Sequence, residues 1–146
     1  MALAAILAAG TLIAPLHTAQ AANPLRIQTN KGPVRGFFCG AATGGPSQRC
    51  TVAGTAAFLG IPYAKPPVGS LRWMPPQGHA KWTSVLVANR FNNLCAQIVT
   101  LGVFAGPANI NEDCLYLNVF TPNLSTSAKL PVWIHGGGNV DGESND

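Results

Sequence analysis

The stretch CLYLNVF, from Cys114 to Phe120, is the part of the sequence that decides the predicted fold. Apolar, aromatic and β-branched residues dominate it, and this composition favours a β-strand. A polar connection beginning at Thr121 leads to a second run of the same kind, PVWIH from Pro131 to His135, which continues into three glycines. Two dense apolar strands beside a glycine loop are typical of a sheet that is covered on both faces.

A proline-rich stretch, IPYAKPPVGSLRWMPPQ, lies upstream of these strands, with five prolines between Pro62 and Pro76. Proline at this density excludes a helix or a central strand, although it permits a stiff extended path. A solvated polyproline linker is the alternative, but it does not explain the large apolar side chains. We therefore expect the segment to pack on a core through its apolar residues Ile61, Tyr63, Leu71, Trp73 and Met74.

The N-terminal half predicts short strands. LRIQT and GPVRGFFCG flank a turn from Asn30 to Pro33, and TVAGTAAFLG continues this β-rich part. Cys39 and Cys50 enclose a loop rich in glycine, proline and serine, and a bridge between them would close that loop at its base.

The first 21 residues carry no charged side chain. Their apolar run, from Ala2 to Leu16, is short for a membrane span and ends at Ala19-Gln20-Ala21, the small-x-small pattern that signal peptidase cleaves. We predict a secretory signal from Met1 to Ala21, and export to the extracellular space or the periplasm. The segment lacks the usual basic start, so a buried helix or a wrong start site remains open.

Composition and cysteine count narrow the class of protein further. A hydrophobic fraction of 47% excludes a disordered chain, whereas 10% charged residues is low for a complete soluble surface. The bases are scattered singly, so nucleic-acid binding is not expected. Four cysteines in an exported chain suggest disulfides, for which three full pairings are possible. A zinc site is not expected, because the sequence has no C-x-x-C motif and no histidine at ligand spacing.

Four blocks of this sequence resemble the type-B carboxylesterases, the family that includes lipases and cholinesterases. The blocks are FLGIPYAKPPVGSLRW, Cys95 with Gln97, EDCLYLNVFTP, and PVWIHGGG with Gly142. They follow the family's order, so residues 22–146 are identified as the N-terminal portion of a type-B domain. The resemblance implies an α/β-hydrolase fold, a mixed, mainly parallel sheet flanked by helices, of which this chain is an incomplete N-terminal part.

The resemblance also implies structural roles for two pairs of residues. Cys95 and Cys114 match the pair that closes a surface loop beside the active-site gorge, and we expect a second bridge between Cys39 and Cys50. Arg72 and Glu112 match a buried ion pair that ties the proline-rich segment to the strand. A guanidinium can bind a carboxylate through two hydrogen bonds, and burial requires such a partner. Two unrelated exposed charges are the alternative.

The motif His135-Gly136-Gly137-Gly138 matches the oxyanion-hole loop of esterases. Acyl transfer places negative charge on the carbonyl oxygen, which preorganised N–H groups must stabilise. By resemblance Gly137 and Gly138 supply two of these donors. A flexible turn is the alternative for a lone glycine triplet. Asn139 stands where the family usually has an aromatic residue, which leaves the shape of the acyl pocket open.

Ser144 completes only half of a nucleophile motif. Gly142-Glu143-Ser144 begins G-x-S-x-G, but Asp146 occupies the closing position and no strand precedes the serine. In the family the nucleophile, the acid and the histidine base lie further downstream, so none of the three is expected within this chain.

The function that the resemblance implies is that of a secreted serine carboxylic-ester hydrolase. Its substrate would be a small-molecule or lipid ester, and no metal or organic cofactor is implied. The alternative is a catalytically inactive, cholinesterase-like adhesion or binding protein, which would have no need of the glycine loop. An independent binding module is a third, weaker possibility because its strands would have exposed edges.

Overall fold

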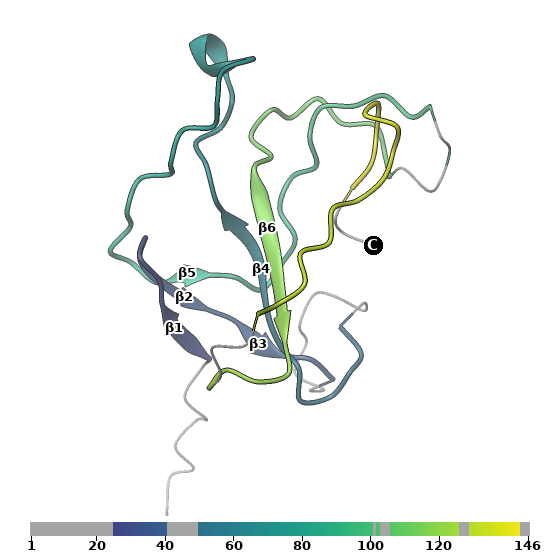
Figure 1. The fold of residues 1–146 in the computed structure, drawn as a ribbon. Helices are drawn as coiled ribbons and strands as arrows, with labels where there is room; N and C mark the ends of the chain where they lie inside the picture. Colours follow the sequence, from purple (N-terminus) through teal and green to yellow (C-terminus); the bar gives the residue numbers. More distant parts are fainter. Residues whose placement is uncertain (1–24, 41–49, 101, 103–105, 126–128, 144–146) are drawn as a thin grey trace, which may run out of the picture.

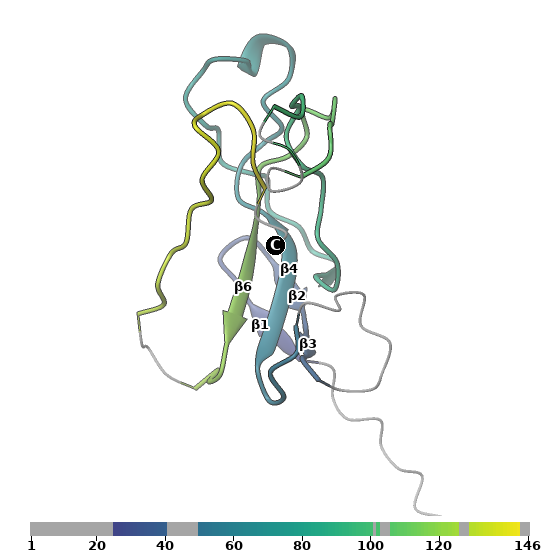
Figure 2. The same cartoon turned by 90° about the vertical axis from the view of Figure 1, so that its right-hand side faces the viewer.

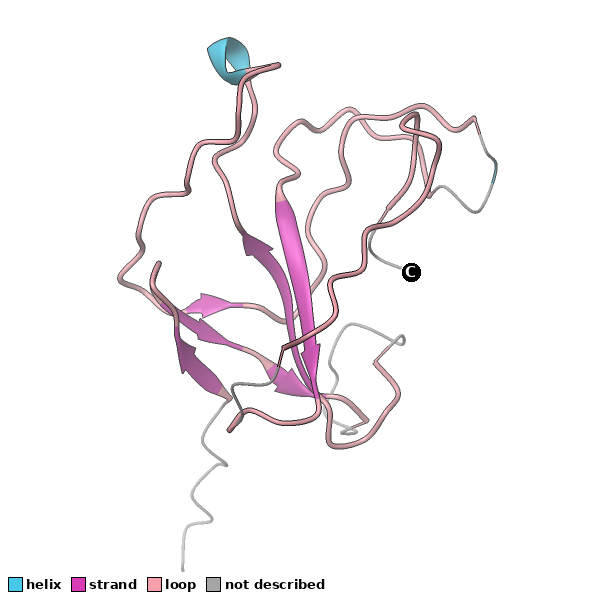
Figure 3. Cartoon of the chain, in the orientation of Figure 1, coloured by secondary structure: helices cyan, strands magenta, loops and turns pink. Residues whose placement is uncertain are grey.

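The computed structural model describes residues 25–40, 50–100, 102, 106–125 and 129–143. The predicted signal segment from Met1 to Ala21 and Ser144 lie outside these described residues. The described chain forms short strands joined by long loops (Figure 3). Its one helical element is a 3-10 turn from Gly69 to Leu71. None of the described helical segments has the length and apolar composition that crossing a bilayer would require.

The described strands form two three-stranded sheets (Figure 1). The chain passes from one sheet to the other at Gly36, between β2 and β3. The first has the order β1-β2-β5 and the second the order β3-β4-β6. The strand bounds are β1 Arg26–Gln28, β2 Pro33–Arg35, β3 Phe37–Phe38, β4 Ala56–Pro62, β5 Leu86–Val87 and β6 Tyr116–Thr121. The strands predicted in the N-terminal half and in CLYLNVF are therefore confirmed.

The pairing differs from a mainly parallel sheet flanked by helices. In the described residues β1–β2, β3–β4 and β4–β6 are antiparallel, and β2–β5 is parallel. The β1–β2 connection is short, which forces antiparallel neighbours, whereas a parallel pair needs a longer crossover. The long β4–β6 connection runs through the prolines of the 62–76 stretch, which do not support a helix. The described residues thus hold three antiparallel pairs and one parallel pair, without the helical layers that the resemblance implies.

The strand that is covered on both faces is β4. Successive residues of a strand point to opposite faces. Ala56 and Phe58 belong to a core cluster with Val34, whereas Ala57 and Leu59 pack on the other face with the Cys39–Cys50 bridge. Cys39 and Cys50, whose Cα atoms are 5.0 Å apart, are both buried.

A bulge in β4 bends it against β6. Leu59 and Gly60 together face Asn118 of β6, because the register shifts between Phe58 and Ile61. Gly60 has a φ of 68°, a left-handed conformation that glycine adopts without strain. Its N–H donates to Oδ1 of Asn118 at 2.8 Å, so a side chain satisfies the group that the bulge removes from the ladder.

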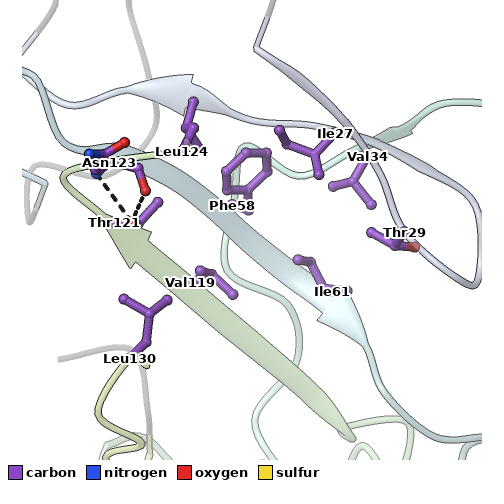
Figure 4. A pocket seen from close by; sticks show the side chains of 10 residues that line it. All are labelled: Ile27, Thr29, Val34, Phe58, Ile61, Val119, Thr121, Asn123, Leu124 and Leu130. Carbon is purple, nitrogen blue, oxygen red and sulfur yellow. Dashed lines mark hydrogen bonds between the residues drawn. The ribbon is translucent and has the colours of Figure 1, made fainter. Parts of the chain in front are cut away.

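An apolar cavity of about 260 Å³ lies between the β1–β2 pair and the β4–β6 pair (Figure 4). Val34 and Phe58 line it together with Val119 and Leu130, which lie at the β6 side. The clustering of aliphatic side chains here explains why these short strands hold together.

The prediction of a second strand from Pro131 to His135 is wrong for the described residues. The segment is drawn as a loop that runs apart from β6 (Figures 2 and 3). Val132 is 86% and Ile134 is 82% exposed, and β6 is an edge strand. A strand requires a neighbour that takes up its N–H and C=O groups, and no described segment provides one here.

Ile61, at the start of the proline-rich segment, packs on a core cluster as expected, whereas the residues that follow it form an arm. Ala64 and Gly78 form an isolated antiparallel bridge at its base, and the 3-10 turn lies at its tip (Figure 1). Tyr63 is 48% exposed and Trp73 is fully exposed. The expected packing is therefore wrong for these two residues and for Met74, because no described element covers the arm.

Candidate functional site

The glycine motif forms a tight turn at the end of the extended segment. The Gly137 carbonyl accepts hydrogen bonds from the N–H groups of Val140 at 3.0 Å and Asp141 at 3.3 Å. Gly138 and Asn139 follow with φ values of 61° and 60°. Two successive positive φ values characterise a type I′ turn, which favours glycine and asparagine. Asn139 suits this turn because asparagine tolerates the left-handed region better than other side chains do.

Only glycine fits at position 137. Its φ is 130°, and a Cβ built there would overlap the Asp141 carbonyl. Gly138 differs, because a Cβ there would meet no atom within 4 Å. The backbone alone therefore occupies the inner side of the turn at Gly137.

The two N–H groups assigned to the oxyanion are not used elsewhere in the described structure. Among the described residues, no acceptor is hydrogen-bonded to the N–H of Gly137 or of Gly138. Nδ1 of His135 lies 2.7 Å from the Gly136 carbonyl oxygen. The turn can thus offer two backbone donors to an anionic oxygen.

Two contacts attach this turn to the loop between Cys95 and Cys114. The Gly142 N–H donates to Oε1 of Gln97 at 2.9 Å. Oδ2 of the buried Asp141 accepts hydrogen bonds from the backbone N–H of Thr100 at 2.8 Å and from its hydroxyl at 2.7 Å. From the sequence, Gln97 was recognised only as part of a family block, and neither Thr100 nor Asp141 was identified. The available signal for Asp141 was an acidic residue directly before Gly142 at the end of the glycine loop.

The structure joins Cys95 to Cys114, with Cα atoms 4.9 Å apart, which is the pairing that the resemblance implies. The enclosed loop is tightened further by Gln97 and Asn109, whose backbones exchange hydrogen bonds at 2.8 and 2.9 Å. Figure 1 shows this loop beside the tip of the glycine turn. The bridge therefore braces the loop that holds the turn.

The turn and the disulfide loop line a common cavity of about 910 Å³, together with β6. Tyr116 lines it and donates a hydrogen bond to Oδ1 of Asp113 at 2.8 Å. Burial, followed by this contact with Asp113, raises the pKa of Tyr116 to about 12, so its phenol stays protonated. The described lining residues include no serine or threonine, and both cysteines there are bridged. No described cluster of three His, Cys, Asp or Glu residues could hold a metal ion.

Arg72 and Glu112 form an ion pair through two hydrogen bonds, from Nε to Oε1 and from Nη2 to Oε2. The expectation that this pair is buried is wrong for the described structure. The side chains are 54% and 34% exposed, because nothing described packs over the arm. The hydrogen bonding from Arg72 to Glu112 lowers the pKa of Glu112. The same hydrogen bonding raises the pKa of Arg72.

Replacing Glu112 by glutamine should change thermal stability only slightly, because exposed ion pairs contribute little. The sign of its pH dependence follows from the lowered pKa of Glu112. The stabilisation is present above the unfolded pKa of about 4.3 and is lost as the pH falls through the lower folded value. The difference in Tm between wild type and E112Q should stay constant from about pH 8 to 5 and vanish near pH 2. A difference that persisted at pH 2 would contradict the assignment, and high salt should reduce it at pH 7.

The chain is similar to known proteins in sequence and in backbone structure. A model of the carboxylesterase family matches residues 23–146. A mouse (Mus musculus) protein, pyrethroid hydrolase Ces2a, is 39% identical over 144 residues, which cover 91% of this chain and 24% of that protein. The precursor of a medium-chain fatty acyl-CoA hydrolase from Anas platyrhynchos is also 39% identical, over 96% of this chain and 26% of the relative. The chain thus spans about a quarter of the length of these relatives.

Solved structures give the same result. A thermophilic PNB esterase superposes with a TM-score of 0.65 at 33% identity, over 82% of this chain and 23% of that one. The carboxylesterase of Geobacillus stearothermophilus superposes with a TM-score of 0.57 at 32% identity, over 81% of this chain and 21% of its own. At these identities the likeness extends to sequence as well as to backbone.

Proposed function

The chain belongs to the carboxylesterase family, and on this premise we propose that it is the oxyanion-binding part of a serine carboxylic-ester hydrolase. The observation that carries the proposal is that Gly137 and Gly138 line a cavity of about 910 Å³ and that the N–H groups of both have no described acceptor. Acyl transfer requires such donors at the carbonyl oxygen of the substrate.

The chemistry divides between this chain and further sequence. A serine nucleophile, activated by histidine and an acid, attacks the ester carbonyl, and the N–H groups of Gly137 and Gly138 bind the oxygen as it becomes negative. The nucleophile, the acid and the base are proposed to lie downstream of residue 146. An inactive binding protein is not favoured, since the relatives named above are hydrolases.

The test of this proposal is hydrolysis of short p-nitrophenyl esters by the full-length protein, with a serine-directed phosphonate as a label. We expect turnover, and a labelled serine that lies outside these 146 residues. Ser144→Ala should leave kcat within about threefold of wild type, because a substitution away from the chemistry typically changes little. The 146-residue chain alone should show no turnover. Labelling of Ser144 would overturn this division of roles.

Export is a separate part of the proposal. The small-x-small pattern ending at Ala21 supports it, and the two disulfides fit an oxidising compartment. Exported protein should begin at Ala22 when its intact mass or N-terminal sequence is determined. Exported material that retained Met1 would contradict the cleavage site.

A further inference from the structure

The glycine turn depends on a neighbouring loop for its orientation. Its own hydrogen bonds, from Val140 and Asp141 to the Gly137 carbonyl, fix its internal shape. They do not fix how it is directed relative to the rest of the site. Glycine is conformationally permissive, so a turn of this composition requires outside contacts to hold one orientation.

Gln97 provides one of these contacts and is itself held in place. Its Oε1 accepts the Gly142 N–H at 2.9 Å, and its Nε2 donates to the Pro107 carbonyl at 3.1 Å. Its backbone exchanges two hydrogen bonds with Asn109. An amide side chain suits this position because it can accept and donate at the same time.

Thr100 provides the second contact, to Asp141, the residue before Gly142. Its hydroxyl and its N–H both donate to Oδ2 of Asp141, whose own N–H donates to the Gly137 carbonyl. Asp141 is 6% exposed, and hydrogen bonds to a buried carboxylate are among the stronger ones. A continuous path of hydrogen bonds therefore runs from Thr100 to Gly137.

We propose that Gln97 and Thr100 are positioning residues that fix the direction of the Gly137 and Gly138 N–H groups. Neither side chain is assigned a contact with reacting atoms, since each acts through the turn. The inference rests on the proposed function, because only an ester hydrolase uses these N–H groups in its transition state. Loss of either contact leaves the donors present but less well directed, and such loss affects the transition state more than substrate binding.

The experiment compares four forms of the full-length protein: wild type, Gln97→Met, Thr100→Val and Thr100→Ser. Q97M keeps the length of the side chain without its polar atoms, and T100V keeps its shape without the hydroxyl. We expect kcat per phosphonate-titrated site to fall roughly ten- to a hundredfold in Q97M and about three- to tenfold in T100V, with KM within about threefold. T100S keeps the hydroxyl and should recover to within about twofold of wild type.

A second measurement separates positioning from general stability. A trifluoromethyl ketone becomes a tetrahedral oxyanion on the enzyme, so its Ki should rise by the same factor by which kcat/KM falls. If Q97M does not fold, the T100V and T100S pair makes the same comparison.

The failures are distinguishable. No ester turnover by the wild type would refute the proposed function and this inference with it. An active wild type whose variants lose Tm or titratable sites, with kcat per site unchanged, would overturn positioning alone.

Discussion

Replacing Gly137 by alanine in the full-length protein should lower kcat for a short p-nitrophenyl ester about a hundred- to a thousandfold, with little change in KM. A Cβ at this position would overlap the Asp141 carbonyl, and the φ of 130° is one that alanine rarely adopts. The carbonyl has little freedom to move, because the Asp141 side chain is tied to Thr100 and its N–H to Gly137. The turn must therefore distort and redirect its donors. Steady-state kinetics on titrated enzyme measures the effect.

Gly138→Ala is the matched control for this experiment. The chemical change is the same, but a Cβ at Gly138 meets no atom within 4 Å. The remaining penalty is the left-handed backbone at φ 61°, about 1–2 kcal/mol, or roughly tenfold in rate if all of it falls on the transition state. A loss in G138A equal to that in G137A would show that the contact with Asp141 is not the cause.

The second large effect is expected from removing the bridge between Cys95 and Cys114. In C95S/C114S the unfolded chain regains the freedom of a loop with a sequence separation of 19, which should cost about 3 kcal/mol of stability. The same loop carries Gln97, so kcat should also fall, by about tenfold, because the donors are less well directed. Denaturant unfolding and kinetics on titrated sites measure the two effects separately.

The bridge between Cys39 and Cys50 supplies the control for this double variant. It packs with Leu59 on a face of β4, and neither of its cysteines lines the large cavity. C39S/C50S should lose a comparable amount of stability, about 2–4 kcal/mol, while kcat per folded molecule remains unchanged. Equal losses of kcat in the two double variants would show that the bridges act only through global stability.

The sequence predicted two kinds of strand correctly: those that pair with a neighbour close in the chain, and those that are strongly apolar. The β1–β2 hairpin follows from its turn, and β4 and β6 follow from their apolar and β-branched residues. PVWIH carries an equally strong signal but forms no strand among the described residues. Strand propensity depends on a neighbour, which is a property of tertiary structure and not of five residues. The two residues of β5 carry too little pattern to be predicted at all.

The candidate site likewise has a part that the sequence predicts and a part that depends on tertiary structure. The glycine turn was predicted because a resemblance identifies it, and the resemblance treats Gly137 and Gly138 alike as donors. The structure distinguishes the two, because a side chain would meet the backbone of the turn at Gly137 but not at Gly138. Gln97 and Thr100 contact residues more than 40 positions away, and no local pattern encodes such contacts.

The pairing of β4 with β6 imposes a delay during translation, because β6 is synthesised well after β4. Phe58 pairs opposite Val119, so about 60 residues must be translated before β4 meets its partner. At typical elongation rates of about 5–20 residues per second, this takes roughly 3 to 12 seconds, whereas the β1–β2 hairpin can close in about 1–10 μs. Throughout that interval Phe58 and Leu59, both buried in the finished structure, lack the strand that covers one edge of β4. The nascent chain therefore presents an apolar strand edge for seconds, a period long enough for chaperones to bind or for neighbouring nascent chains to associate.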